Sequence, residues 1–142
     1  MATKNKEERV EFTRENFSSG SPLEAKVGYS RVVKAGPFIF VGGTTSVQPD
    51  GTVYGEGSMY EQCKFIFAKM VKCLEDAGGK KEEVVRVKMY LTDMSLASEA
   101  ITAYSEVFKE IKPLCTAVGT SALNRPSQLA EIEIDAIKGA VC

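Results

Sequence analysis

The segment from Ser58 to Gly79 restricts the fold most, because it carries a complete signature of an amphipathic helix. Ser58 and Glu61 are spaced as a capping box, in which each side chain satisfies a backbone amide at the helix start. Gly78 and Gly79 mark its end. Between them, apolar residues recur at three- and four-residue spacing: Met59, Cys63, Ile66, Phe67, Met70, Leu74 and Ala77. A helix with one apolar stripe must cover another apolar surface, which here requires a sheet or a second helix.

Strand patterns lie on both sides of this helix. Residues 29–34 and 38–43, joined by a turn at 35–37, are typical of a β-hairpin. Residues 82–93 alternate in polarity, as in a strand with one apolar face. The apolar set of that strand is Val85, Val87, Met89 and Leu91. These segments predict a sheet against which the helix packs.

The C-terminal part repeats the rhythm of helix and strand. A second amphipathic helix is predicted over residues 95–112, and it ends before Pro113 because proline disfavours helix in the preceding residue. Residues 114–123 and 129–137 resemble two further strands. The economical arrangement is a sheet with both helices on one face, since each helix has one apolar stripe and each strand one apolar side.

The N-terminal part differs from the rest. Residues 1–26 are polar and rich in turn residues, with one short strand expected near residues 10–13. We therefore expect a flexible N-terminal segment over 1–26 and a single domain over 27–142. A chain of 142 residues suits one globular domain.

The second face of the predicted sheet is too polar for a core. It carries the alternate residues of two strands, with charges of both signs beside hydroxyl groups, which suits a wet interface between subunits. The residues on this face are Arg86, Lys88, Tyr90, Thr92, Glu131, Glu133 and Asp135.

The absence of histidine excludes more chemistry than any residue present suggests. It removes Ser-His-Asp and Cys-His triads, histidine-ligated metals and acid–base catalysis by imidazole. The four cysteines have no C-x-x-C spacing, so we expect no metal site. The net charge of -1 does not favour nucleic acid as a partner. The charged start and the lack of a long apolar run predict a cytoplasmic protein with free thiols and no membrane partner.

Several motifs together resemble one known family. They are "GYSRVVKAG", "FIFVGGTT", "EEVVRVKMYLTDM", "YSEVF" and the pair "PLCTAV" and "EIEIDAI", which span about residues 27–139. As a set they are similar to the YjgF-like or Rid family of reactive intermediate deaminases, also called liver perchloric-acid-soluble proteins. The resemblance implies an α+β, chorismate-mutase-like fold with a mixed sheet, assembled as a homotrimer with a small-molecule cleft at each subunit interface. In the deaminase branch, the cleft hydrolyses 2-imino or 2-enamino acids without a cofactor.

The resemblance also implies site residues. The family's site tyrosine matches Tyr29, its ligand-facing glycine matches Gly43, and its last-strand glutamate matches Glu133, which would hold or activate water. Glu133 has an alternative role as an interface carboxylate paired with Lys88 or Arg86. Thr44 is a further candidate for the substrate pocket.

Departures from the family pattern concern the substrate carboxylate. Deaminase members clamp it with an arginine where this chain has Cys115, a bidentate contact worth more than a single charge-assisted hydrogen bond of ~1.5–3 kcal/mol. Gly42 replaces a serine and Ile101 an asparagine. Either another cation replaces the clamp, with Arg31 as the candidate, or the ligand differs.

Cys115 itself has three open roles: a nucleophile, a ligand-contact residue together with Thr116, or a packing residue. Three functions also stay open at this stage. They are a cofactor-free hydrolase acting on a C=N bond, a non-catalytic metabolite-binding or chaperone-like module, and an endoribonuclease.

Overall fold

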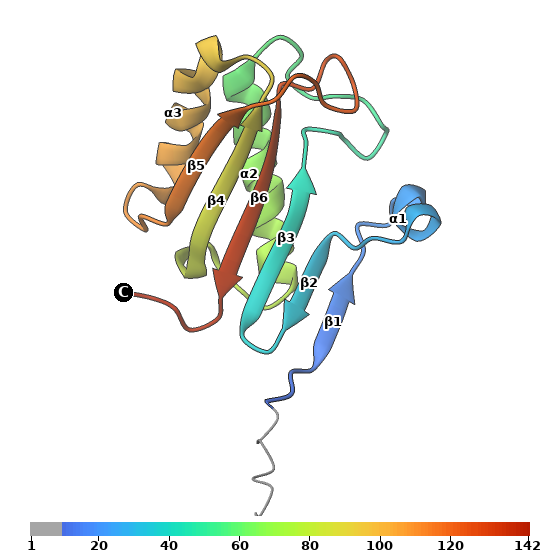
Figure 1. Ribbon diagram of the computed structural model, residues 1–142, viewed down its shortest axis with the longest axis vertical. Helices are drawn as coiled ribbons and strands as arrows, with labels where there is room; N and C mark the ends of the chain where they lie inside the picture. The colour runs from blue at the N-terminus through green and yellow to red at the C-terminus, as the bar shows by residue number, and fades with distance from the viewer. Residues whose placement is uncertain (1–9) are drawn as a thin grey trace, which may run out of the picture.

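A six-stranded mixed sheet organises the computed structural model, which describes residues 10–142. The strand order is β1-β2-β3-β6-β4-β5, as Figure 1 shows. All neighbouring pairs are antiparallel except β4 and β5. The strands are β1 (Arg14–Phe17), β2 (Val32–Ala35), β3 (Phe38–Thr44), β4 (Val84–Leu91), β5 (Leu114–Gly119) and β6 (Ala130–Ile137). The helices are α1 (Pro22–Val27), α2 (Met59–Asp76) and α3 (Ala97–Phe108), with short 3-10 turns η1 (Lys81–Glu83) and η2 (Met94–Leu96).

The helices α2 and α3 lie together behind one face of this sheet, so the predicted arrangement is confirmed. α3 is the crossover that makes β4 and β5 parallel, since parallel neighbours need a long connection. The core lies between helices and sheet, and Phe67 of α2 meets Tyr104 and Phe108 of α3 edge-on. The whole predicted stripe of α2 is buried there.

The start of α2 uses half of the predicted capping box. The Ser58 hydroxyl accepts a hydrogen bond from the Glu61 amide at 3.2 Å. The Ser58 amide donates to the Gly55 carbonyl instead of the Glu61 side chain. Gly78, with φ of 89°, follows the helix as expected.

The N-terminal prediction needs correction. The strand expected at residues 10–13 lies at Arg14–Phe17, where β1 pairs with β2 at the edge of the sheet. Sequence periodicity gave no signal because the polar side chains of β1 are mostly exposed. β1 and α1 therefore extend the regular structure across the boundary predicted at residue 27; residues 1–9 lie outside the described residues.

One shift in strand register changes which residues reach the core. The pairing of β4 with β6 is irregular between Val84 and Arg86. Consequently Val84, and not the predicted Val85, is buried beside Val87. A bulge inserts one residue and reverses the inward and outward sense of the strand beyond it. No helix within residues 10–142 is long and apolar enough to cross a membrane.

Candidate functional site

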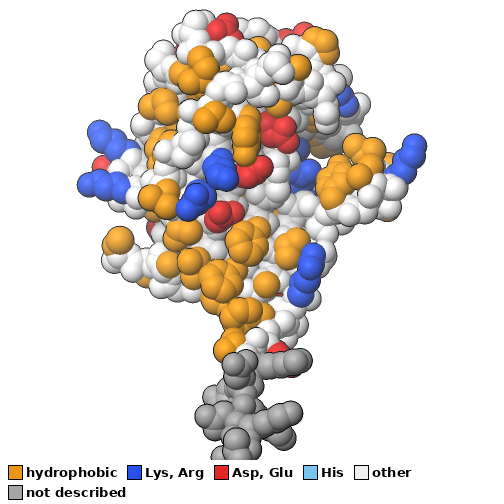
Figure 2. Space-filling model, viewed as in Figure 1, with side chains coloured by type: hydrophobic (Ala, Val, Ile, Leu, Met, Phe, Trp, Pro, Cys, Tyr) orange, Lys and Arg blue, Asp and Glu red, His pale blue; other side chains and the backbone are white. Residues whose placement is uncertain are grey.

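The face of the sheet opposite the helices, called here the open face, carries rows of charge on β4 and β6. Register pairs Asp135 with Arg86 and Glu133 with Lys88. The Arg86 Nε to Asp135 Oδ2 distance is 3.9 Å. Glu131 instead pairs with Tyr90. Glu131 is thus the one carboxylate of the β6 row that has no cation opposite it on β4. Figure 2 shows these charges near the middle of the face, with hydrophobic side chains around them.

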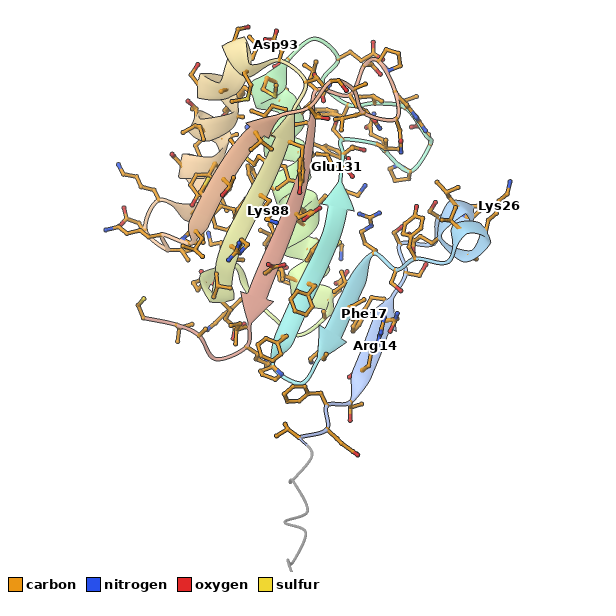
Figure 3. All side chains as sticks on the ribbon, in the orientation of Figure 1. Arg14, Phe17, Lys26, Lys88, Asp93 and Glu131 are labelled. Atoms are coloured by element: carbon orange, nitrogen blue, oxygen red, sulfur yellow. The ribbon has the colours of Figure 1, made fainter. Side chains whose placement is uncertain are left out.

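Glu131 also lies in a crowded environment. It projects from β6 beside the end of β3 (Figure 3), where its carboxylate occupies the space that a side chain at position 43 would fill. A methyl group at position 43 would overlap Oε1 of Glu131. Burial raises the pKa of Glu131, the charge of Glu133 raises it further, and Arg31 lowers it in part. The net rise keeps a proton on this carboxyl group to higher pH than usual.

Gly43 belongs to a second irregularity, between β3 and β6. Val41 pairs with Ile134 and Thr44 pairs with Ile132, so Gly42 and Gly43 together stand opposite Glu133. This pair of glycines is called here the bulge. Two residues opposite one leave backbone groups without partners in the sheet.

Arg31 satisfies those groups. Its Nη1 donates to the carbonyl oxygens of Gly42, at 3.3 Å, and Gly43, and to Thr44 Oγ1 at 3.0 Å. The Thr44 hydroxyl in turn donates to the Gly42 carbonyl at 2.8 Å. Arg31, the bulge and Thr44 therefore form one closed network under Glu131, and three predicted site residues lie together.

Tyr29 comes two residues before Arg31, but it is not on a strand. β2 begins at Val32, and the Tyr29 amide is bonded to the carbonyl of Glu24 within α1. The predicted strand start at Tyr29 is therefore wrong, and both Tyr29 and Arg31 precede the strand. Tyr29, which is 39% exposed, borders a hollow of about 390 Å³ lined also by Asn16, Phe17, Ser18, Glu24, Ala25, Gly28 and Ser30.

Cys115 and Thr116 are separated from this corner and from each other. In register, Cys115 pairs with the buried Val87, and Thr116 pairs with Lys88 of the open face. Successive strand residues point to opposite faces, so Cys115 turns toward α3, where Tyr104 hydrogen-bonds its thiol. Within one chain, the two residues do not share a site with Glu131.

The environments of Cys115 and Cys63 disfavour ionisation of their thiols. Burial raises the pKa of Cys115, and the bond from Tyr104 lowers it only in part. Burial, followed by the charge of Glu99, raises the pKa of Cys63 to about 12. Thiolate is the nucleophilic form, so neither environment favours covalent catalysis. No group of three or more cysteine and acidic residues suited to a metal ion occurs in residues 10–142.

Glu131 is the residue that sequence reasoning passed over in favour of Glu133. Both glutamates point to the same face of β6, and the isoleucines between them point to the other face. Sequence periodicity therefore cannot distinguish the two glutamates. Proximity to Gly43 and to Arg31 distinguishes them, and it depends on the register between β6 and its neighbours. A larger hollow, of about 520 Å³, lies between α3, η1 and the C-terminal tail and contains none of these residues.

Comparisons with known proteins identify the family and agree with the fold. The family model described as Endoribonuclease L-PSP matches residues 19–138. An uncharacterized protein from Streptomyces coelicolor is 33% identical over 123 residues, which are 87% of this chain and 91% of that protein. A RutC family protein from Pyrococcus abyssi is 36% identical over 110 residues, 78% of this chain and 86% of that protein. A crystal structure of a YjgF/YER057c/UK114 family member from Mycobacterium tuberculosis has a TM-score of 0.80 and 35% identity, covering 88% of this chain and 99% of that one.

Proposed function

The chain belongs to the endoribonuclease L-PSP family, which includes the YjgF and RutC proteins, and on this premise we propose that it hydrolyses a small C=N compound beside Glu131. Water adds across the C=N bond of an imine, and the resulting carbinolamine loses ammonia to leave a carbonyl compound. The ionised Glu131 carboxylate takes one proton from the attacking water and gives it to the imine nitrogen. It then takes the proton of the carbinolamine hydroxyl and gives it to the leaving nitrogen, so both protons of the water end on ammonia. This work suits a carboxyl group whose pKa lies above the usual range.

The observation that carries the proposal is the difference between Glu131 and Glu133. Glu133 stands opposite Lys88, which suits its alternative role as an ion-pair partner. Glu131 stands over Gly43, the position that the resemblance assigns to ligand contact, and has no cation opposite it on β4. The catalytic role first assigned to Glu133 is therefore proposed for Glu131.

The complete cleft requires another copy of the chain. Thr116 on β5 and Tyr29 just before β2 lie toward opposite edges of the sheet, so one subunit cannot place both beside one ligand. Several apolar side chains of the open face are exposed, among them Phe40 at 43%, Leu114 at 62% and Val118 at 42%, which suits burial by a partner. We propose the homotrimer typical of the family, with Tyr29, Gly43 and Thr44 from one subunit facing Thr116 on the open face of the next, while Cys115 lies on the α3 side of the same strand. Sedimentation should then give three times the mass of one chain.

A matched pair of variants tests the chemistry. Imines are generated in place from a panel of amino acids, and ammonia release is measured above the buffer rate. Glu131→Gln should lose the excess by about 100-fold or more, because a positioned acid–base group contributes on that order. Glu133→Gln removes the same charge from the same strand face and should retain most of it. Equal losses in both variants, or full activity in Glu131→Gln, would refute the assignment.

Binding without turnover is the second candidate, and the state of Cys115 favours it. Its thiol has a raised pKa, and the arginine clamp that the resemblance leads one to expect is replaced by this uncharged group. Retention of a small ligand in equilibrium dialysis, with no ammonia from any imine, would identify this outcome. Cleavage of a labelled RNA by wild type but not by Glu131→Gln would instead support the activity in the family model's description.

A further inference from the structure

We infer that Arg31 is a positioning residue, which seats Glu131 by holding the bulge and by supplying the cation that faces this carboxylate from the β2 side. This inference deepens the proposed function, on which its catalytic meaning rests. It assigns Arg31 a role different from the carboxylate clamp expected from sequence, which remains a prediction.

The guanidinium of Arg31 is hydrogen-bonded to the bulge and to Thr44. All of its bonds to other described residues run through Nη1, to two carbonyl groups of the bulge and to the Thr44 hydroxyl. A single planar nitrogen therefore fixes the backbone where β3 departs from regular pairing. The Arg31 backbone completes the arrangement, since its carbonyl accepts from the Gly42 amide at 2.9 Å.

The backbone at Gly43 leaves room for the Glu131 carboxylate. The Glu131 carboxylate fits against Gly43 only because position 43 has no side chain. A small rotation of the peptide at Gly43 would move the surface on which the carboxylate rests. Arg31 holds that peptide by its carbonyl oxygen, so it controls the position of Glu131 without contacting a ligand.

Charges of both signs surround Glu131. On its own strand it faces Glu133, which disfavours its ionised form. On β4 it faces Tyr90, with Lys88 one pair further along opposite Glu133. On the β3 side Gly43 carries no charge, and beyond it lies Arg31, which favours the ionised form. Removal of the Arg31 charge would leave the repulsion from Glu133 and the cost of burial without this compensation.

The experiment measures the titration of Glu131 directly, without any ligand. Glutamate is labelled with ¹³C at the carboxyl carbon, and the Glu131 resonance is identified by its loss in Glu131→Gln. In Arg31→Gln, the Glu131 midpoint should move to higher pH than in wild type. Arg31→Lys, which keeps the charge, should restore the wild-type midpoint. Arg86→Gln is the control, because Arg86 lies on the same sheet beside Asp135 and not beside Glu131.

An unchanged midpoint in Arg31→Gln, or an equal shift in Arg86→Gln, would overturn the inference. Should Arg31→Gln fail to fold, Arg31→Lys carries the test: the Gly43 amide resonance should move while the Glu131 midpoint stays, and the reverse pattern would overturn it. Ammonia release separates the two proposals. Arg31→Gln should lower it about 10- to 100-fold. A shifted midpoint in a protein that never releases ammonia refutes only the proposed function, whereas an unshifted midpoint in an active protein refutes only the role of Arg31.

Discussion

Replacement of Gly43 by alanine should separate function from stability. A methyl group there overlaps Oε1 of Glu131, and its other near contacts belong to the same flexible side chain. A favourable distance between the methyl carbon and Oε1 is about 3.5 Å, so the carboxylate would have to move by about 1 Å. A displacement of that size costs on the order of 100-fold in rate. The fold should tolerate the change, because φ at Gly43 is not positive and a compatible alanine stabilises by about 0.4–1 kcal/mol through the unfolded chain.

Gly42→Ala is the matched control for this prediction. A methyl group at position 42 meets only the carbonyl oxygens of Arg31, at 3.4 Å, and Ser30, at 3.6 Å, and it does not reach Glu131. Both variants should unfold in urea within about 1 kcal/mol of wild type. Only Gly43→Ala should lose ammonia release. Wild-type activity in Gly43→Ala, or an equal loss in Gly42→Ala, would show that activity does not depend on the position of the Glu131 carboxylate against Gly43.

Three further predictions concern caps, thiols and pH. Ser58→Ala should cost about 1 kcal/mol in urea unfolding, because its hydroxyl caps α2. Tyr104→Phe should slow the labelling of Cys115 by iodoacetamide at pH 8, measured by mass spectrometry, because the lost bond is the one that lowers the pKa of that thiol. Burial opposes ionisation of Glu24, but hydrogen bonds from Ser19 and Ser18 and the charge of Arg31 together outweigh it, so the pKa is lowered. Its stabilisation is therefore present above its unfolded pKa and lost as the pH falls, so Glu24→Gln should cost about 1.5–3 kcal/mol at pH 7 and much less at pH 3.

The elements with strong periodicity could be predicted from the sequence because their signals are local. The stripe from Met59 to Ala77 specifies both the extent of α2 and the face that it buries. The alternation in β6 likewise assigns Ile132, Ile134 and Ala136 to the buried face and the three carboxylates to the other. Each of these patterns has a length and a period that only one regular structure satisfies.

The errors arose where pairing between distant segments decides the outcome. Val84 replaces Val85 in the core because of a bulge against β6, which no local pattern of valines reveals. The segment Arg14–Phe17 is a strand because β2 offers it an edge, although its side chains are polar. Tyr29 follows the C-terminal cap of α1 and does not begin a strand, since its amide is bonded to the Glu24 carbonyl.

The distinction between Glu131 and Glu133 is the same problem at the candidate site. The sequence "EIEID" presents three carboxylates of equal phase, and only cross-strand register gives two of them a cation on β4. The paired glycines of β3 were visible in the sequence, yet their effect appears only when β3 meets β6 and two residues face one. The bulge interrupts the regular hydrogen bonding between β3 and β6. Arg31 donates replacement hydrogen bonds to the bulge carbonyl groups, and this network lies beside Glu131. Arg31, Gly43 and Glu131 therefore form one unit, and substitutions at any two of them should be non-additive, as expected for residues in a shared network.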